Sequence, residues 1–146
     1  MQALKRVRFN QNKMCSMTNE EKVEHWTELS EYDLETADAM LQTKRYLYVG
    51  FMCHQVVEKI FKAYYEKRKE ETPPYSHKLI LLAQQGDFYD ELNEEQIDFL
   101  LEIEPLNIET RYTEYKERLL RRLTPTYCTT LINRTKTLQQ WIKIQL

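Results

Sequence analysis

The sequence predicts an all-helical protein, and two observations carry this prediction. The chain is poor in residues that interrupt helices, with 2 glycines and 4 prolines among 146 residues, whereas Leu, Glu, Lys and Gln are common. Its apolar residues recur at spacings of three and four, which is the period of a helix and not of a strand. A chain of this length fits one domain with a hydrophobic core of its own.

The first helix is expected to begin at Thr18 and to run to about Thr43. Thr18 and Glu21 have the spacing of a capping box, in which each side chain bonds to the backbone N–H of the other residue. Asp33 falls within the apolar line of this helix. A carboxylate there either lies at the margin of the line or needs a cation from another helix.

A central helix is predicted from Tyr48 to Lys69, after a short turn at residues 43–45 that makes the two helices antiparallel neighbours. Its apolar arc is wide, so we expect burial on most sides. Gly50 inside this helix would be explained by the close approach of another helix. The remaining narrow stripe is polar and either faces water or lines a cleft for a ligand or partner. We call it the polar seam: Gln55, Glu58, Lys59, Lys62 and Glu66.

Three further helices are expected. Pro73-Pro74 closes the central helix, and Ser76 can cap a third helix from His77 to about Gln85. Asn93, with Gln96 three residues later, opens a fourth helix that Pro105 is expected to stop. Thr124-Pro125 is typical of a helix start, and the last helix should run to the C-terminus.

Residues 105–124 are predicted to form a long connection before the last helix, and such connections often carry function. This segment is rich in guanidinium and phenol groups, which suit phosphates and bases. The alternative is a solvated loop pinned by its tyrosines. The residues concerned are Arg111, Tyr112, Tyr115, Lys116, Arg118, Arg121 and Arg122.

Residues 1–17 are expected to lie outside the domain, which would cover residues 18–146. The segment carries basic residues and no acid, and it has no apolar periodicity. We expect a disordered tail, or an upstream extension because Met14 and Met17 could each start translation. A nucleic-acid-binding arm is the alternative.

Charge and composition exclude several classes of protein. The formal net charge is -2, so nucleic-acid binding requires a local basic patch and not a global field. Cys15, Cys53 and Cys128 have no metal-binding spacing, and with no secretory signal we expect free thiols in the cytoplasm. No apolar run is long enough to span a membrane.

Common catalytic motifs are also absent. The glycines lie too far apart for a phosphate loop, and the histidines have no metal-ligand spacing with acids on one helix. Cys53 and His54 are adjacent, so on a helix their side chains diverge by about 100° and cannot form a nucleophile–base pair. We therefore assign no metal, no cofactor and no catalytic residue.

Four short motifs follow one another along the chain: Trp26 with Asp33-Leu34 and Ala37; His54-Gln55 with Glu58-Lys59 and Lys62-Ala63; Ser76-His77-Lys78-Leu79; and Thr110-Arg111-Tyr112. Taken in this order, they resemble the HEPN domain family, small helical domains named for nucleotide binding in higher eukaryotes and prokaryotes. The second motif is similar to the family's Gln-x-x-Glu-Lys-x-x-Lys-Ala, the third to its Thr-His-Asp-Leu and the fourth to its Arg-Tyr-Pro. The resemblance covers about residues 20–144.

The resemblance implies an antiparallel up-and-down four-helix bundle with an additional short helix, often dimeric. It implies work beside a small nucleotidyltransferase, frequently in a toxin–antitoxin pair. Many other family members are metal-independent endoribonucleases, with an Arg followed four to six residues later by His. Here no His follows His77, and Thr113 replaces the usual Pro. The resemblance therefore favours binding over RNA cleavage.

We expect a non-catalytic protein that binds a nucleotide or RNA phosphate, a nucleotidyltransferase partner, or both. Lys59, Lys62 and Arg111 are expected to converge on one anion, with Asp33 or Glu58 holding a cation in place. The alternatives are an endoribonuclease using Arg111, with Tyr112 or His77 moving protons, and a purely structural dimerising adaptor. The expected ligand contacts are Gln55, Lys59, Lys62, His77, Arg111 and Tyr112.

A homodimer is expected because the predicted helices carry more apolar surface than a small bundle can bury. Some large apolar side chains should then be exposed in a monomer and mark the interface. The candidates are Trp26, Phe51, Phe61 and Trp141.

Overall fold

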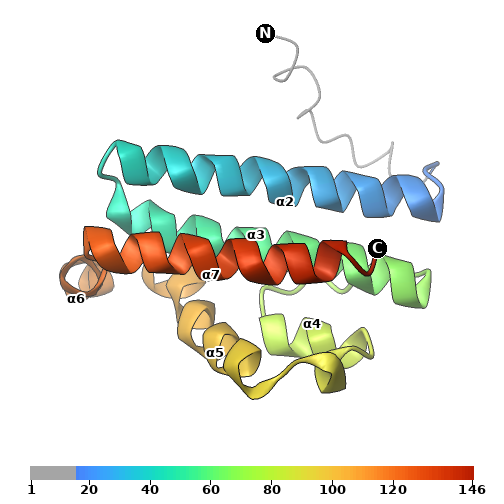
Figure 1. Cartoon of the computed structure of the whole chain (residues 1–146). Helices are drawn as coiled ribbons and strands as arrows, with labels where there is room; N and C mark the ends of the chain where they lie inside the picture. Colours follow the sequence, from blue (N-terminus) through green and yellow to red (C-terminus); the bar gives the residue numbers. More distant parts are fainter. Residues whose placement is uncertain (1–15) are drawn as a thin grey trace, which may run out of the picture.

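The computed structural model describes residues 16–146, which form a bundle of helices without a strand (Figure 1). The all-helical prediction is confirmed. The expectation about residues 1–17 lies outside the described residues, apart from Ser16 and Met17. The long helices are α2 (Asn19–Gln42), α3 (Tyr46–Lys69), α5 (Glu94–Glu109) and α7 (Pro125–Lys143). The shorter ones are α4 (Leu79–Gln85), the 3-10 helix η2 (Tyr89–Glu91) and α6 (Thr113–Arg122).

The α3 helix is the centre of the bundle and contacts α2, α4, α5, α6 and α7. In Figure 1, α2, α3 and α7 lie alongside one another, with α2 antiparallel to the other two. The α5 helix crosses α3 obliquely and runs against its direction. The four long helices therefore alternate in direction along the chain, as an up-and-down bundle requires.

Capping side chains begin three of the long helices as the sequence predicts. The Thr18 hydroxyl accepts the Glu21 N–H at 3.2 Å, and the Glu21 carboxylate accepts the Thr18 N–H at 2.8 Å. Asn93 and Gln96 make the same reciprocal pair at the start of α5. The Thr124 hydroxyl caps α7, which begins at Pro125. These bonds satisfy backbone donors that a helix start leaves unpaired.

Gly50 lies where α5 and the residue after α6 approach α3. A Cβ atom at this position would lie 3.1 Å from Leu106 Cδ1 and 3.5 Å from Leu123 Cδ2. Leu106 is fully buried, and Leu123 is nearly so. The expected close approach is confirmed, and it fixes the end of α5 against α3.

Two expectations about residues 105–124 are wrong. The α5 helix does not stop at Pro105 but continues to Glu109. Proline removes one backbone donor, and here the buried Ile103 and Leu106 on either side hold the helix against the core. The rest of the segment is not a long connection, because α6 occupies Thr113–Arg122.

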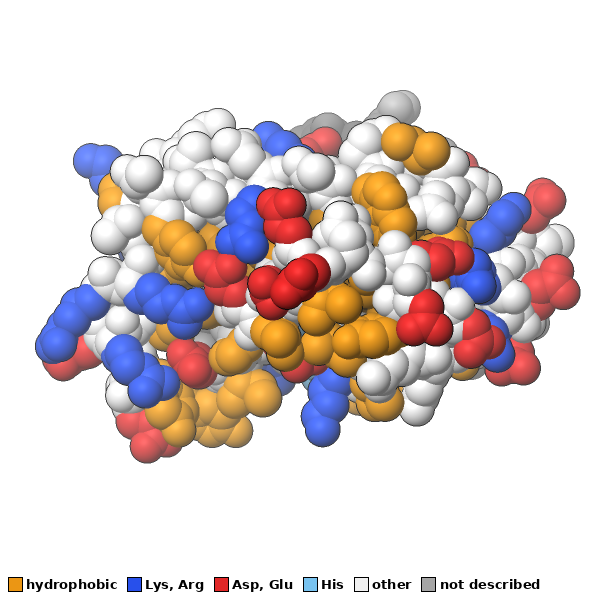
Figure 2. Space-filling view, turned by 60° about the horizontal axis from the view of Figure 1, so that its bottom comes forward, with side chains coloured by type: hydrophobic (Ala, Val, Ile, Leu, Met, Phe, Trp, Pro, Cys, Tyr) orange, Lys and Arg blue, Asp and Glu red, His pale blue; other side chains and the backbone are white. Residues whose placement is uncertain are grey.

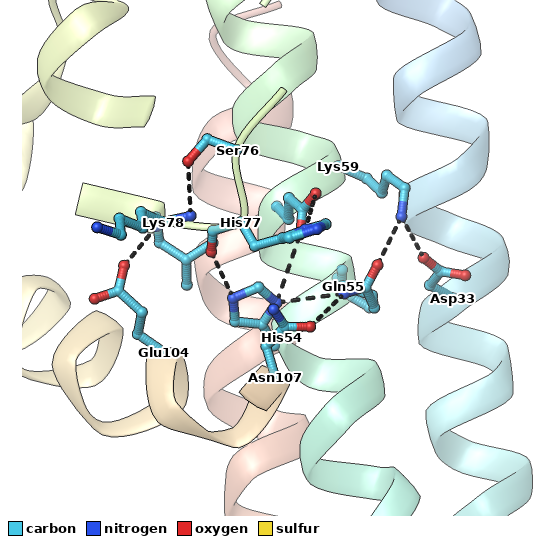
Figure 3. Close-up of polar contacts among 12 residues, drawn as sticks. Asp33, His54, Gln55, Lys59, Ser76, His77, Lys78, Glu104 and Asn107 are labelled. Carbon is cyan, nitrogen blue, oxygen red and sulfur yellow. Dashed lines mark hydrogen bonds and ion pairs between the residues drawn. The ribbon is translucent and has the colours of Figure 1, made fainter. Parts of the chain in front are cut away.

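The third helix begins later than expected. His77 and Lys78 lie outside the helix, Lys78 with an extended backbone, and α4 starts at Leu79. Within residues 16–146, the Ser76 hydroxyl bonds only to the Lys78 N–H, at 3.1 Å, while the Leu79 N–H donates to Glu104 of α5 at 2.7 Å (Figure 3). A distant carboxylate therefore replaces the local cap.

Of the four apolar residues among which exposed ones are expected, two are buried and two are half-buried. Trp26 and Phe61 are buried, while Phe51 and Trp141 are half-buried. The outer face of α5 instead exposes Leu101 and Ile108, at 54% and 58%. In residues 16–146, no helix combines the length and apolar character that crossing a membrane requires.

Candidate functional site

The polar seam of α3 faces the bundle and not water. Glu58, Lys62 and Glu66 are 2%, 6% and 0% exposed, and Gln55 and Lys59 are half-buried. Burying charges is costly unless they are paired. The seam must therefore find its partners on the neighbouring elements.

Asp33 and Lys59 form the first pair. Lys59 Nζ lies 3.4 Å from Asp33 Oδ2 and donates to Gln55 Oε1 at 3.0 Å (Figure 3). The cation expected for Asp33 thus comes from α3. Burial raises the pKa of Asp33, and Lys59 only partly offsets this effect. The pair is a desolvated one between α2 and α3, not an exposed surface bridge.

Glu58 is the centre of the second cluster. Its carboxylate accepts hydrogen bonds from Lys62 Nζ at 2.9 Å and from His77 Nδ1 at 3.0 Å. Burial alone would raise the pKa of Glu58, but Lys62 and His77 outweigh it and lower the pKa below its ordinary value. Glu58 is therefore ionised, and its bond to His77 holds the segment before α4 against α3.

His54 joins the same cluster in its neutral form. Burial lowers the pKa of His54 to about 4, despite the nearby Glu58. Its Nε2 donates to the backbone carbonyl of His77 at 2.9 Å, so the proton is on Nε2 (Figure 3). His54 is thus a positioning group for the segment that carries His77.

Asn107 connects the seam to Arg111. The Asn107 side chain is almost fully buried, and its Oδ1 accepts from Gln55 Nε2 and from Arg111 Nη2, each at 3.3 Å. The sequence does not single out Asn107, because Pro105 predicts that the helix ends before it. With α5 continued to Glu109, Asn107 lies in the last turn, and Arg111, two residues beyond the helix, bonds back to it.

The predicted contact residues divide into a buried and an exposed group. Lys62 is paired with Glu58, and its Nζ lies 5.3 Å from the Trp26 ring centroid. Arg111 is exposed and lies over Phe51 at 5.7 Å. Arg111 reaches Lys59 only through Asn107 and Gln55. Each lysine already has a carboxylate partner, whereas Arg111 keeps donors at the surface.

Tyr112 and α6 extend the exposed group into a basic and aromatic surface. Tyr112 packs edge-to-face on Tyr115, and the Arg118 guanidinium lies 5.1 Å from the Tyr115 ring centroid. Figure 2 shows several Lys and Arg side chains, interspersed with Asp and Glu, at the end of the molecule where α6 lies. We call this the α6 surface, and its exposed members are Arg111, Tyr112, Lys116, Arg118, Arg121 and Arg122.

The arginines of the α6 surface have only weak protein partners. Arg118 lies 3.4 Å from Glu109, and Arg121 lies 3.9 Å from Glu117 with both side chains largely exposed. Arg122 lies over the Tyr127 ring at 5.8 Å. Exposed pairs of this kind contribute at most about 1 kcal/mol. Their guanidinium groups can therefore exchange these partners for phosphate oxygens.

Within residues 16–146, no group of three or more His, Cys, Asp or Glu side chains is placed to hold a metal ion. A comparison with protein families matches the HEPN domain over residues 23–145. No curated protein and no solved structure gave a match.

Proposed function

Because this chain belongs to the HEPN domain family, we propose that it is a non-catalytic binding protein that recognises the phosphates of RNA or of nucleotides. The α6 surface supports the proposal most directly. It places exposed guanidinium groups beside tyrosine rings, which combine charge-assisted bonds to phosphate with stacking on bases. Arg111 and Tyr112 are its predicted contact residues.

The polar seam has a supporting role in this proposal. Lys59 and Lys62 bond to Asp33 and Glu58, and Gln55 and Asn107 lead from this network to Arg111. Through these hydrogen bonds, the seam orients the Arg111 side chain. His77, with its side chain partly exposed, is a peripheral contact in this scheme.

A small nucleotidyltransferase is the proposed protein partner, in a toxin–antitoxin type of pair. The support is the family membership, and the observation that would test it is a nucleotidyltransferase encoded beside this chain. We also propose a cytoplasmic location, in line with the free thiols of Cys53 and Cys128, whose pKa values burial raises to about 12 and about 11. No metal or cofactor enters the proposal.

A homodimer is the proposed form in solution. Leu101 and Ile108, seven residues apart, give the outer face of α5 an exposed apolar stripe. A two-fold axis would pack the exposed α5 stripe of one copy against the same stripe of the other.

An endoribonuclease is the second candidate, with Arg111 stabilising the charged phosphate. It needs a group that moves protons. The His77 ring bonds to Glu58 through Nδ1, and among residues 16–146 no hydrogen bond joins it to Arg111. The geometry therefore supports binding better than cleavage.

Titration of a labelled single-stranded RNA tests the proposed function. The triple variant Arg118→Ala/Arg121→Ala/Arg122→Ala should bind at least tenfold more weakly than the wild type, and the wild type should lose affinity as salt rises. Lys67→Ala is the matched control, because Lys67 is an exposed cation at the far end of α3. Equal losses in the control and the triple variant would contradict a localised α6 site.

A further inference from the structure

A cavity of about 270 Å³ lies between α5 and α7, and its lining shares no residue with the polar seam or the α6 surface. In Figure 1, α5 diverges from α7 toward its own N-terminal end. The space opens between the first turns of α5, near Asn93 and Gln96, and the middle of α7, near Asn133. Its volume suits a single ring system better than a whole nucleotide.

The floor of the cavity is apolar and carries a fixed cationic plane. Phe99 and Leu138 are each 3% exposed. The Arg134 guanidinium lies over the Phe99 ring at 4.4 Å and is held by Glu102 at 2.6 Å. A guanidinium fixed against an aromatic ring is a stacking surface for a planar ligand.

Amide and hydroxyl groups line the edge. Asn93 and Gln96 use their side-chain oxygens to cap α5, so their NH₂ groups remain as donors. No hydrogen bond occupies the Asn133 side chain within residues 16–146. Thr137 donates to the Asn133 carbonyl at 3.0 Å and keeps its lone pairs. The edge therefore offers donors and acceptors, as the edge of a heterocycle requires.

The charges of the cavity disfavour a phosphate. Burial alone would raise the pKa of Glu102, but hydrogen bonds from Tyr127 and Arg134 hold it below its usual value. Glu102 is therefore ionised, and its charge neutralises that of Arg134. Glu95 adds a carboxylate to the lining. An anionic ligand would meet no net positive charge here, whereas a neutral ring would meet stacking and hydrogen bonds.

We propose that the cavity between α5 and α7 binds one neutral planar heterocycle of the nucleobase class. The ring stacks on Arg134 and bonds at its edge to the amides of Asn93, Gln96 and Asn133. The inference deepens the proposed function, and it rests on that function for the source of the base, which is an RNA or nucleotide held elsewhere by its phosphates.

Free nucleosides test this inference, because they carry no phosphate for the α6 surface to bind. The full chain is titrated with adenosine, guanosine, cytidine and uridine, followed by NMR shifts or calorimetry. At least one nucleoside should bind, and Arg134→Lys should weaken it about fivefold or more, because Lys keeps the charge and lacks the stacking plane. Thr137→Met, at an exposed position, should block the cavity without disturbing the core.

Arg118→Ala is the control and should leave nucleoside affinity unchanged. Two results overturn the inference: no nucleoside binds up to its solubility limit, or binding survives both Arg134→Lys and Thr137→Met. If RNA still binds through α6 in either case, the proposed function stands alone. If nucleosides bind in the cavity and RNA does not bind, the proposed function fails and the cavity assignment stands.

Discussion

Asn107 Oδ1 accepts a hydrogen bond from Arg111 Nη2 at 3.3 Å, so a surface guanidinium is tied to an almost fully buried amide. The same oxygen accepts from Gln55 of α3, at the same distance. Arg111 is thereby oriented by the core of the bundle and not by its own exposed turn. This bond links the buried network to the α6 surface.

Replacing Asn107 tests this link. Asn107→Leu removes the hydrogen bonds that Asn107 Oδ1 accepts from Gln55 and Arg111, and a typical hydrogen bond contributes about 0.5–1.5 kcal/mol to the unfolding free energy. RNA affinity should fall as well, because Arg111 loses its orientation. Asn107→Asp is the control, since it keeps the accepting oxygen. Urea denaturation and RNA titration give the two readouts, and equal behaviour of both variants would contradict the positioning role.

The fold follows from local signals more fully than the candidate site does. Thr18, Asn93 and Thr124 mark helix starts because a capping side chain acts within three residues. The start of α4 was misplaced because its cap, Glu104, lies 25 residues away in the chain. The end of α5 is predicted four residues too early, at Pro105. A proline removes one backbone hydrogen bond from a helix, and the burial of neighbouring side chains can outweigh this loss.

The site was harder to predict because burial decides which charges are free. Lys62 and Arg111 look alike in the sequence, yet Glu58 neutralises one while the other stays at the surface. The α6 helix was missed although Tyr115, Leu119 and Leu123 recur at spacings of four. Their period indicates a helix with one buried side, and Leu119 and Leu123 are indeed buried.

The pH dependence of stability should reflect His54. Its pKa is lowered by burial from 6.5 to about 4, so the unfolded chain takes up a proton near pH 6.5 that the folded protein refuses until about pH 4. The contribution of neutral His54 to the unfolding free energy is therefore fully present above pH 6.5. It falls by up to about 3 kcal/mol as the pH drops to 4. His54→Gln should flatten this part of the curve; an unchanged slope would contradict the assignment.

Glu66 should show the opposite pH dependence. Burial raises its pKa although Lys22 and Trp26 act in the opposite direction, so folding favours the protonated form relative to the unfolded chain. Its contribution is fully present below the ordinary pKa of 4.5 and is lost as the pH rises through the folded value. Glu66→Gln should therefore match or exceed the wild type in unfolding free energy at pH 7. A large loss there would show that ionised Glu66 is needed.

The proposed dimer should depend on the outer face of α5. Leu101→Lys combined with Ile108→Lys should give a monomer in light scattering at micromolar concentration, while the wild type gives a dimer. Ile144→Lys is the control, because Ile144 is 76% exposed and follows the C-terminal end of α7, outside the α5 stripe. A wild type that is monomeric under these conditions would contradict the proposed homodimer.

Purified protein should not cleave RNA in metal-free buffer, because no histidine follows Arg111 in the sequence to move protons. A mixed RNA pool is incubated with wild type and with Arg111→Ala. If the wild type cleaves RNA and Arg111→Ala does not, the protein is an endoribonuclease and the binding proposal is wrong.

The most direct test of the central claim compares RNA binding and stability in Arg111→Ala. The guanidinium is exposed, so its loss should change the unfolding free energy by no more than about 0.5 kcal/mol. RNA affinity should fall several-fold, and the dependence of affinity on salt should become shallower by about one phosphate contact. If Arg111→Ala instead unfolds the domain while the wild type binds neither RNA nor mononucleotides, Arg111 is structural and the proposed site is contradicted.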